Sequence, residues 1–140
     1  MDYFNQIHAL LTLIDRAPIV GERRLQKIAY LADLPFRFEL REMGPYSFEL
    51  SAMMVKLLET DMITLEETYI LMETGRSFLD RLSKDGYQIE LSEDVTLLSR
   101  FTPDRLEAMA TVKYLKEIGY SEETAKKKVA ILRPNLKAVL

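Results

Sequence analysis

The sequence predicts a mainly α-helical domain that contains one small β-hairpin. Through most of the chain, apolar residues recur every three or four positions, which is the period of a helix packed on a core. Two short alternating segments, Ile63 to Leu65 and Tyr69 to Leu71, flank Glu66-Glu67-Thr68 and predict the hairpin. With 140 residues, 48% of them hydrophobic, the chain is expected to form a single domain over residues 1–140.

Two helices are expected before the middle of the chain. The first spans Tyr3 to Asp15 and ends near Ala17-Pro18, because a residue that precedes proline avoids the α conformation. The second spans Glu22 to Asp33, and Leu34-Pro35 ends it. Its apolar stripe is expected to face the core, with its basic residues on the other side.

An extended arm is expected between the second and third helices. Residues Phe36 to Met43 alternate between apolar and charged side chains, which predicts a half-buried strand or arm that Gly44-Pro45 ends. Ser47 is the expected N-cap of the third helix, and Glu49 lies in its first turn, where negative charge is favourable.

The third helix, from Phe48 to about Thr60, is apolar on two sides. Its main stripe faces the core, whereas Phe48 and Val55 lie seven residues apart on the opposite side. Three arrangements are open for this second side: the C-terminal helices cover it, a second copy covers it, or it is bare.

The rest of the chain is expected to be helical. A fourth helix spans Gly75 to Lys84, and a short one lies within Asp94 to Arg100. A longer helix is expected after the Thr102 cap, and a last one between the Ser121 cap and Pro134. Residues 94–134 are therefore expected to pack as C-terminal helices on a core formed by residues 1–86.

Three helices, a hairpin and another helix follow one another in the order of a winged helix, here with the arm inserted between its second and third helices. The segment Tyr69 to Gly75 is similar to the Y-x-L-T-x-x-G segment that closes many winged-helix domains. Met72 stands where that segment has its capping Thr, so Thr74 is the substitute cap.

A wider resemblance is to the YwgA-like proteins, and more distantly to the Panacea domain of SocA-type antitoxins. Arg24-Leu25-Gln26-Lys27-Ile28 resembles the family's R-L-Q-K-L helix, and Gly44-Pro45-Tyr46-Ser47 resembles its G-P-Y-S segment. Met109 to Leu115 and Leu132-Arg133-Pro134 are similar to its last helix and K-P ending. The resemblance implies a winged-helix-like fold, and the SocA-type relatives imply work as a protein adaptor or antitoxin.

Nothing in the residues favours catalysis. The chain has one histidine, His8, expected to be half-exposed, and it has no cysteine, so neither a His-based metal cluster nor a thiolate site is expected. The five glycines are scattered and form no phosphate loop or dinucleotide fingerprint. We therefore expect no catalytic residue, no cofactor and no metal, and an enzyme is the most distant alternative.

Charge is spread unevenly, which bears on nucleic-acid binding. Residues 59–94 contain ten acids and three bases, net -7, and residues 113–140 contain seven bases and three acids, net +4. The third helix offers only Lys56 to DNA, and the hairpin tip is acidic. The DNA-binding candidates, each also interpretable as part of a solvated face, are therefore Arg23, Arg24, Lys27, Lys126, Lys127, Lys128 and Arg133.

The favoured interpretation is a non-catalytic regulatory or antitoxin-like adaptor that binds a protein partner or a second copy. The interface candidates are Phe48, Val55 and Tyr46. A DNA-binding transcriptional regulator is the alternative. The lack of cysteine, of a signal peptide and of a long apolar run fits a cytoplasmic protein without a membrane span.

Overall fold

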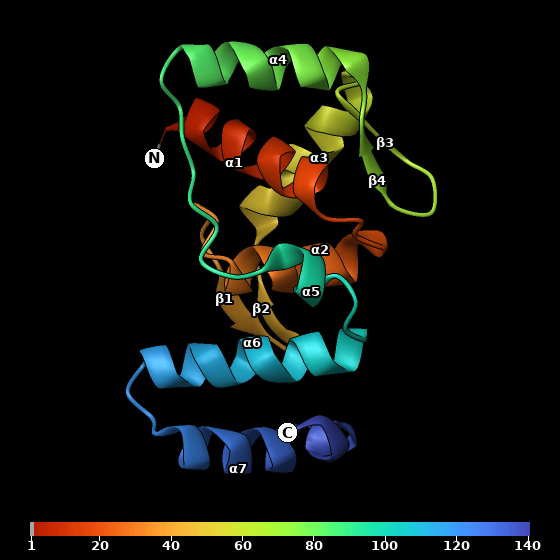
Figure 1. Cartoon of the computed structure of the whole chain (residues 1–140). Coiled ribbons are helices and arrows are strands. Elements are labelled where there is room, and N and C mark those ends of the chain that lie inside the picture. The colour runs from red at the N-terminus through yellow and green to blue at the C-terminus, as the bar shows by residue number, and fades with distance from the viewer. Residues whose placement is uncertain (1) are drawn as a thin grey trace.

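A computed structural model describes residues 2–140, which form seven α-helices, one 3-10 helix and two β-hairpins (Figure 1). In chain order the elements are α1 Tyr3–Arg16, α2 Gly21–Leu31, β1 Glu39–Arg41, β2 Gly44–Tyr46, α3 Phe48–Glu59, β3 Ile63–Leu65, β4 Tyr69–Leu71, α4 Glu73–Lys84, α5 Val95–Leu98, α6 Pro103–Glu117, α7 Glu122–Leu132 and the 3-10 helix η1 Pro134–Val139. The mainly α prediction and the predicted β3-β4 hairpin are confirmed. No helix within these residues is both long and apolar enough to cross a membrane.

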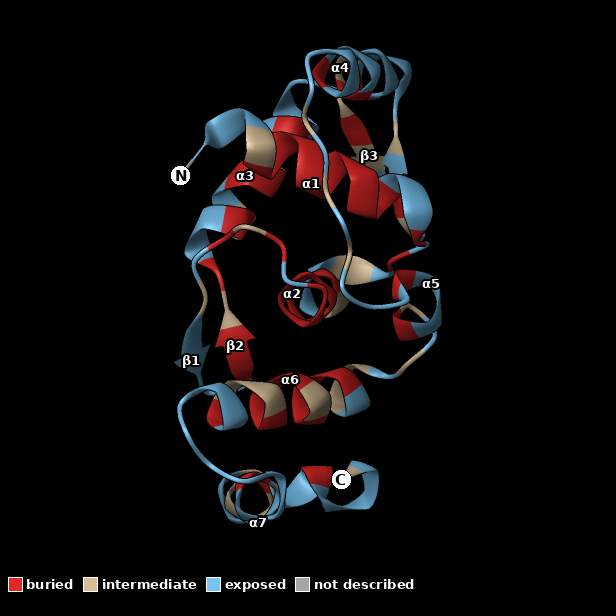
Figure 2. Cartoon of the chain, turned by 60° about the vertical axis from the view of Figure 1, so that its left-hand side comes forward, coloured by how far each residue is buried: buried red, intermediate tan, exposed pale blue. Residues whose placement is uncertain are grey.

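The helices are stacked in layers along the long direction of the molecule. Figure 1 shows α4 at one end, followed by α1 and α3, then α2, then α6, and α7 at the other end. The main core lies between α1, α2 and α3, where Leu10, Leu25 and Leu50 are fully buried. Figure 2 shows that the buried residues line the facing sides of these helices. Burial of this apolar surface is the dominant stabilising contribution.

The C-terminal helices form a layer of their own. Helix α6 packs on α2 and on strand β2, whereas α7 and η1 pack mainly on α6. A second, smaller apolar cluster joins them, with Val112, Val129 and Leu136 among its buried residues. Residues 94–134 thus reach the core through α5 and α6, and α7 forms the outermost layer rather than a direct cover of residues 1–86.

The predicted arm is in fact a second hairpin. Strand β1 pairs antiparallel with β2, Leu40 opposite Pro45, so the prediction that Gly44-Pro45 ends the extended segment is wrong. The chain reverses at Glu42 and Met43, and Gly44 adopts a φ of +95°, which is accessible to glycine without steric cost. The half-buried prediction holds only at the start of the arm, because Phe36 is buried and Leu40 is exposed.

Helix α3 begins at the predicted cap. The Leu50 amide donates to the Ser47 hydroxyl at 3.0 Å, and Leu50, Met53, Met54 and Leu57 are buried in the core. Of the three arrangements open for the second side of α3, cover by the C-terminal helices is wrong: within the chain Phe48 and Val55 are exposed. The reason is geometrical: α6 and α7 occupy the far side of α2, away from α3 (Figure 1).

Candidate protein-interaction surface

Exposed apolar side chains of the β1-β2 hairpin and of α3 form one surface. We call it the hairpin-α3 surface and define it by Leu40, Met43, Tyr46, Phe48 and Val55. Phe48 is 55% exposed and Val55 is 50% exposed, while Tyr46 is half-buried. All but Val55 line a shallow hollow of about 670 Å³, to which Arg41 and Glu42 add charge. Of the three predicted interface candidates, Phe48 and Val55 are therefore exposed, and Tyr46 is half-buried beside Phe48.

The aromatic residues of this surface are held in a fixed arrangement. The Tyr46 and Phe48 rings meet edge to face with centroids 5.0 Å apart, and the Arg41 guanidinium lies 5.1 Å from the centroid of the Phe48 ring. Edge-to-face pairs and cation-π contacts each contribute roughly 0.5–1.5 kcal/mol at such sites. Phe48 is thus exposed and yet oriented by two neighbours.

A buried side-chain amide of α2 binds Ser47, the N-cap of α3 that directly follows strand β2. The Nε2 atom of Gln26 donates to the Ser47 carbonyl at 2.9 Å, and the Oε1 atom of Gln26 accepts from the Ser47 amide at 2.8 Å. Both groups are buried, and the Gln26 side chain pairs with Ser47 as a neighbouring strand would. Gln26 of α2 therefore binds the N-cap residue of α3 and fixes the start of α3 relative to α2.

Gly44 and Pro45 pack where α2 meets α6. A Cβ atom at Gly44 would lie 2.8 Å from the Thr111 hydroxyl, so the hairpin approaches α6 as closely as a glycine allows. The Lys27 ammonium donates to the Pro45 carbonyl at 2.8 Å. Burial lowers the pKa of Lys27 to about 8, although the nearby Glu107 carboxylate raises it.

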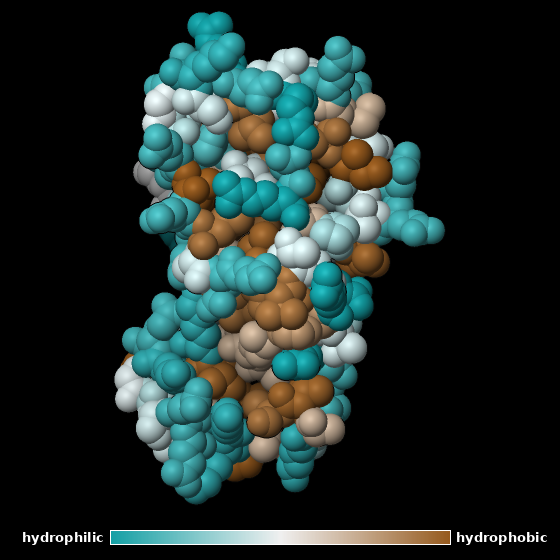
Figure 3. All heavy atoms as spheres, viewed as in Figure 1, coloured by the Kyte–Doolittle hydropathy of each residue, from teal (hydrophilic) through white to brown (hydrophobic). Residues whose placement is uncertain are grey.

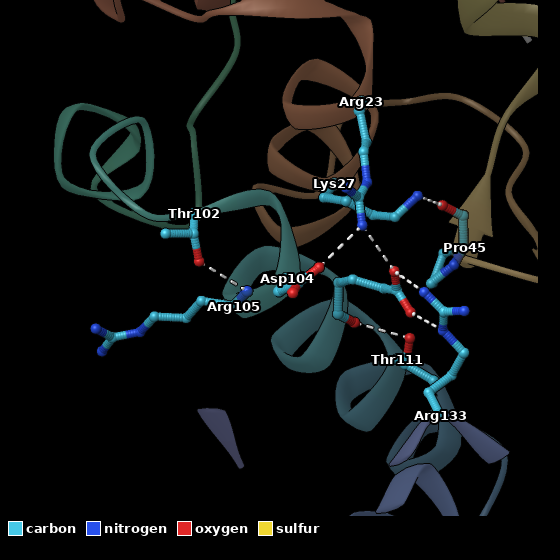
Figure 4. A network of polar contacts seen from close by, with 9 residues as sticks. Arg23, Lys27, Pro45, Thr102, Asp104, Arg105, Thr111 and Arg133 are labelled. Carbon is cyan, nitrogen blue, oxygen red and sulfur yellow. Dashed lines mark hydrogen bonds and ion pairs between the residues drawn. The ribbon is translucent and has the colours of Figure 1, made fainter. Parts of the chain in front are cut away.

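Behind the hairpin, Glu107 of α6 is the centre of a buried ionic network (Figure 4). Its carboxylate is 1% exposed and accepts from Arg23 of α2 and from Arg133 at the end of α7. Arg23 also pairs with Asp104 at 3.2 Å. A buried carboxylate is tolerated only with such partners, and here they join three helices.

The first group of DNA-binding candidates is used within the fold. Lys27 is 3% exposed, so the expectation that it lies at a solvated or DNA-binding surface is wrong, because the hairpin packs against it. Arg23 binds Asp104 and Glu107, and Arg24 donates to the Phe101 and Val20 carbonyls. These side chains are already committed to oxygen partners of the same chain.

The second group of DNA-binding candidates consists of three lysines of α7 and of Arg133, which follows α7. Their surroundings differ. Lys126 is exposed, Lys127 is exposed and pairs with Glu123 at 3.2 Å, and the Lys128 ammonium lies 4.7 Å from the centroid of the Tyr120 ring. Arg133 belongs to the Glu107 network. Lys126 also borders a hollow of about 600 Å³ beside α6 and α7, whose charged lining has both signs and comprises Glu93, Arg105, Lys113, Lys116, Glu117, Glu122 and Lys126.

Apolar side chains are also exposed outside the hairpin-α3 surface. Figure 3 shows one face of the molecule, on which brown apolar side chains lie between teal polar ones over several elements. Ile131 of α7 is 78% exposed and is the most accessible of them among the described residues. Isolated exposed apolar residues are ordinary, whereas a set that shares one hollow and fixed ring contacts is not.

His8 is buried, so the expectation of a half-exposed side chain is wrong. Its Nε2 atom lies 3.1 Å from the exposed Ser83 hydroxyl, and burial lowers its pKa. Its Nδ1 atom has no hydrogen-bond partner in the described part of the chain. The His8–Ser83 pair therefore lacks an acceptor at Nδ1, which in a catalytic triad orients the histidine ring. Residues 2–140 also contain no group of three or more His, Asp or Glu side chains placed to hold a metal ion.

Comparisons of the chain with protein-family models, with curated proteins and with solved structures found no match. The assignment of the candidate surface and of the network behind it therefore rests on the geometry of these residues alone.

Proposed function

We propose that this chain is a non-catalytic regulatory module that binds another protein through the hairpin-α3 surface. The observation that carries the proposal is the bare second side of α3, where Phe48 and Val55 are half exposed and Phe48 is oriented by Tyr46 and Arg41. Aromatic residues and an arginine around a shallow apolar hollow are the composition of a protein-binding hot spot.

A protein fits this surface better than a nucleic acid does. Helix α3 offers one basic side chain, Lys56, together with Glu49 and Glu59, and the tip of the β3-β4 hairpin presents Glu66 and Glu67. Carboxylates at both elements would repel phosphates, and α3 has no arginine, asparagine or glutamine to bind base edges. An apolar or basic protein surface meets neither obstacle.

The winged-helix interpretation and the relationship to the YwgA-like and SocA-type antitoxin proteins are part of this proposal. Support comes from the two stretches that carry the resemblance, which bond directly to each other: Gln26 pairs with Ser47, and Lys27 donates to Pro45. Both stretches serve to fix the hairpin against α2. An adaptor or antitoxin role follows from this relationship and from the bare apolar side of α3.

The proposal is tested with immobilised protein and quantitative mass spectrometry of retained proteins, followed by calorimetry with the purified partner. Phe48→Asp and Val55→Asp should each abolish binding of a partner that the unchanged chain retains, while the far-UV circular dichroism is unchanged. Ile131→Asp is the matched control, because Ile131 is more exposed and lies on α7. Equal binding by all four proteins would exclude the hairpin-α3 surface as the interface.

DNA binding is the second function, and the exposed Lys126 and Lys127 of α7 favour it. It predicts retention of duplex DNA at low salt that falls steeply as salt rises, because bound phosphates release counterions. Lys126→Glu with Lys127→Glu should abolish that retention, whereas Phe48→Asp should not change it. That pair of results would replace the protein-binding proposal with a DNA-binding one.

A further inference from the structure

Strand β1 pairs with β2 along one edge, and no strand pairs with its other edge in the described residues. The sheet to which it belongs has two strands, and β2 is the inner one, because it packs on α2 and α6. All three residues of β1 are exposed, and Figure 2 shows the strand at the outer margin of the molecule. No third strand pairs with β1 within residues 2–140, so one side of its backbone has unpaired N–H and C=O groups.

The charges of β1 are self-complementary. The strand reads Glu39-Leu40-Arg41, an acid and a base on either side of a central apolar residue. The Glu39 and Arg41 side chains are 54% and 56% exposed, and their carboxylate and guanidinium are 3.8 Å apart, a loose contact at the surface. Glu39 and Arg41 can therefore exchange this loose contact for a better one across a strand pair, and Arg41 also lies beside the Phe48 ring.

We propose that β1 pairs antiparallel with β1 of a second copy of this chain. The proposed sheet has the order β2-β1-β1-β2 and a two-fold axis at Leu40, so that Leu40 lies opposite the partner's Leu40. This register places Glu39 opposite the partner's Arg41 and Arg41 opposite the partner's Glu39. Opposite charges in directly facing positions stabilise a strand pair, and a two-fold arrangement makes the contact twice.

The charges also select this register over its neighbours. A shift of two residues in one direction places Glu39 opposite the partner's Glu39, and in the other direction it places Arg41 opposite the partner's Arg41. Like charges that face each other directly destabilise a strand pair. Exposed Met43 and Phe48 border the same hollow as Leu40 and are available for burial beside the paired strands.

The inference does not depend on the proposed function. Pairing uses the backbone edge of β1, whereas Val55 lies seven residues along α3 from Phe48, about 10 Å at the rise of an α-helix. A variant that no longer self-associates but still binds the partner can therefore be distinguished from a variant that self-associates but no longer binds the partner. Val55→Asp tests the proposed function alone and Glu39→Arg tests the pairing alone, because Glu39 does not line the hollow. Arg41→Glu also removes the contact of Arg41 with the Phe48 ring, so its effect is judged together with that of Glu39→Arg.

The experiment exploits the self-complementary charges. Glu39→Arg produces a strand with two bases, and Arg41→Glu produces a strand with two acids. Each single variant should associate with itself about tenfold more weakly than the unchanged chain, because both facing pairs become repulsive. Mixed in equal amounts, the two variants should form a one-to-one heterodimer, and a chain with both changes should form a homodimer again.

Sedimentation equilibrium gives the mass against the 16.3 kDa of one chain, and native mass spectrometry with one variant tagged identifies the heterodimer. Hydrogen exchange should show protection of residues 39–41 that increases with protein concentration. Glu90→Arg, an exposed change in the loop between α4 and α5, is the matched control and should leave association unchanged. Association should also weaken at high salt, because exposed ion pairs are screened.

Three results would overturn the proposal. One is an unchanged chain that stays monomeric at millimolar concentration. Another is a dimer that persists undiminished in both single variants, since it would use a different surface. The third is failure of the two single variants to combine although each folds, as judged by circular dichroism.

Discussion

Arg133 and Glu107 form a two-point ion pair across the C-terminal layer. The Nε atom of Arg133 donates to Oε2 of Glu107 at 2.8 Å, and its Nη2 atom donates to Oε1 at 3.2 Å. Oε1 also accepts from Arg23 of α2 at 3.2 Å. The residue that follows α7 is therefore held to α2 through a single buried carboxylate of α6.

Removing the charge of Glu107 should destabilise the protein by about 2–4 kcal/mol, because a buried network loses the group that both guanidiniums share. The change is Glu107→Gln, measured by urea denaturation. Asp104→Asn is the control, since the Asp104 side chain pairs with the same Arg23 at the same 3.2 Å but is 47% exposed, and the change should cost about 0–1 kcal/mol. Equal effects of the two changes would show that burial of Glu107 does not matter.

Gly44→Ala should cost more than Gly86→Ala. Both glycines have a φ near +95° to +100°, so each alanine carries the same backbone penalty of about 1–2 kcal/mol. Only at Gly44 does the added Cβ meet a neighbour, the Thr111 hydroxyl at 2.8 Å, whereas at Gly86 nothing lies within 4 Å. We expect about 1–3 kcal/mol of additional destabilisation at Gly44 in chemical denaturation. A Gly44→Ala chain as stable as Gly86→Ala would contradict the close approach of the hairpin to α6.

Gln26→Leu should destabilise the protein by about 2–4 kcal/mol, because it leaves the amide and the carbonyl of Ser47 buried without partners. Gln26→Glu keeps an acceptor for the Ser47 amide but has no donor for the carbonyl, so it should also destabilise. Thermal and urea denaturation measure both changes. The exposed Gln88 provides the control, and Gln88→Leu should alter the free energy of unfolding by less than about 0.5 kcal/mol.

The dependence of stability on pH should reveal the buried Lys27. Burial lowers its pKa from 10.5 to about 8 in the folded protein. Between these two values the unfolded chain binds a proton at Lys27 that the folded protein does not, so the contribution of this group to stability rises with pH across that window. Below about 8 both states are protonated and the contribution is constant.

Lys27→Met should therefore remove part of the rise in unfolding free energy between pH 8 and 10.5, as measured by urea denaturation across that range. Lys84→Met, at an exposed lysine of α4, should leave the slope unchanged. Identical slopes for the two variants would mean that Lys27 is solvated in the folded protein.

The helices were predictable because their signals are local. The apolar stripes give their positions, and the Ser47, Thr102 and Ser121 hydroxyls each accept from a backbone amide three residues on, at 3.0–3.2 Å. One local signal was wrong: Thr74 lies within the first turn of α4, and Met72 occupies the cap position without a side-chain bond. Gly75, in the same turn, lies against the chain before β3, since a Cβ there would lie 2.1 Å from the Met62 carbonyl oxygen.

The β1-β2 hairpin and the Glu107 network were not predictable from the sequence, because their partners are distant in the chain. Gly44-Pro45 indicates the end of a strand by every local rule, yet Lys27 donates to Pro45 from 18 residues away and Thr111 packs against Gly44 from 67 residues away. A basic residue such as Lys27 is normally exposed, and only the hairpin folded over α2 buries it. Whether the C-terminal helices cover the second side of α3 was also open from the sequence, and tertiary packing decided it by placing α6 on α2.

The attachment of the inner strand has a thermodynamic consequence for any molecule that docks on the outer one. Strand β2 is anchored to α2 and α6 by Lys27 and the tight contact at Gly44, the next residue, Ser47, is bound by Gln26, and β1 is joined to this anchored segment by its pairing with β2. We therefore expect β1 to be ordered before any partner docks on it. Docking on a stiff edge forfeits little conformational entropy, since the recognising backbone is ordered beforehand. Even a three-residue strand can then support an association that a flexible arm of the same sequence would not.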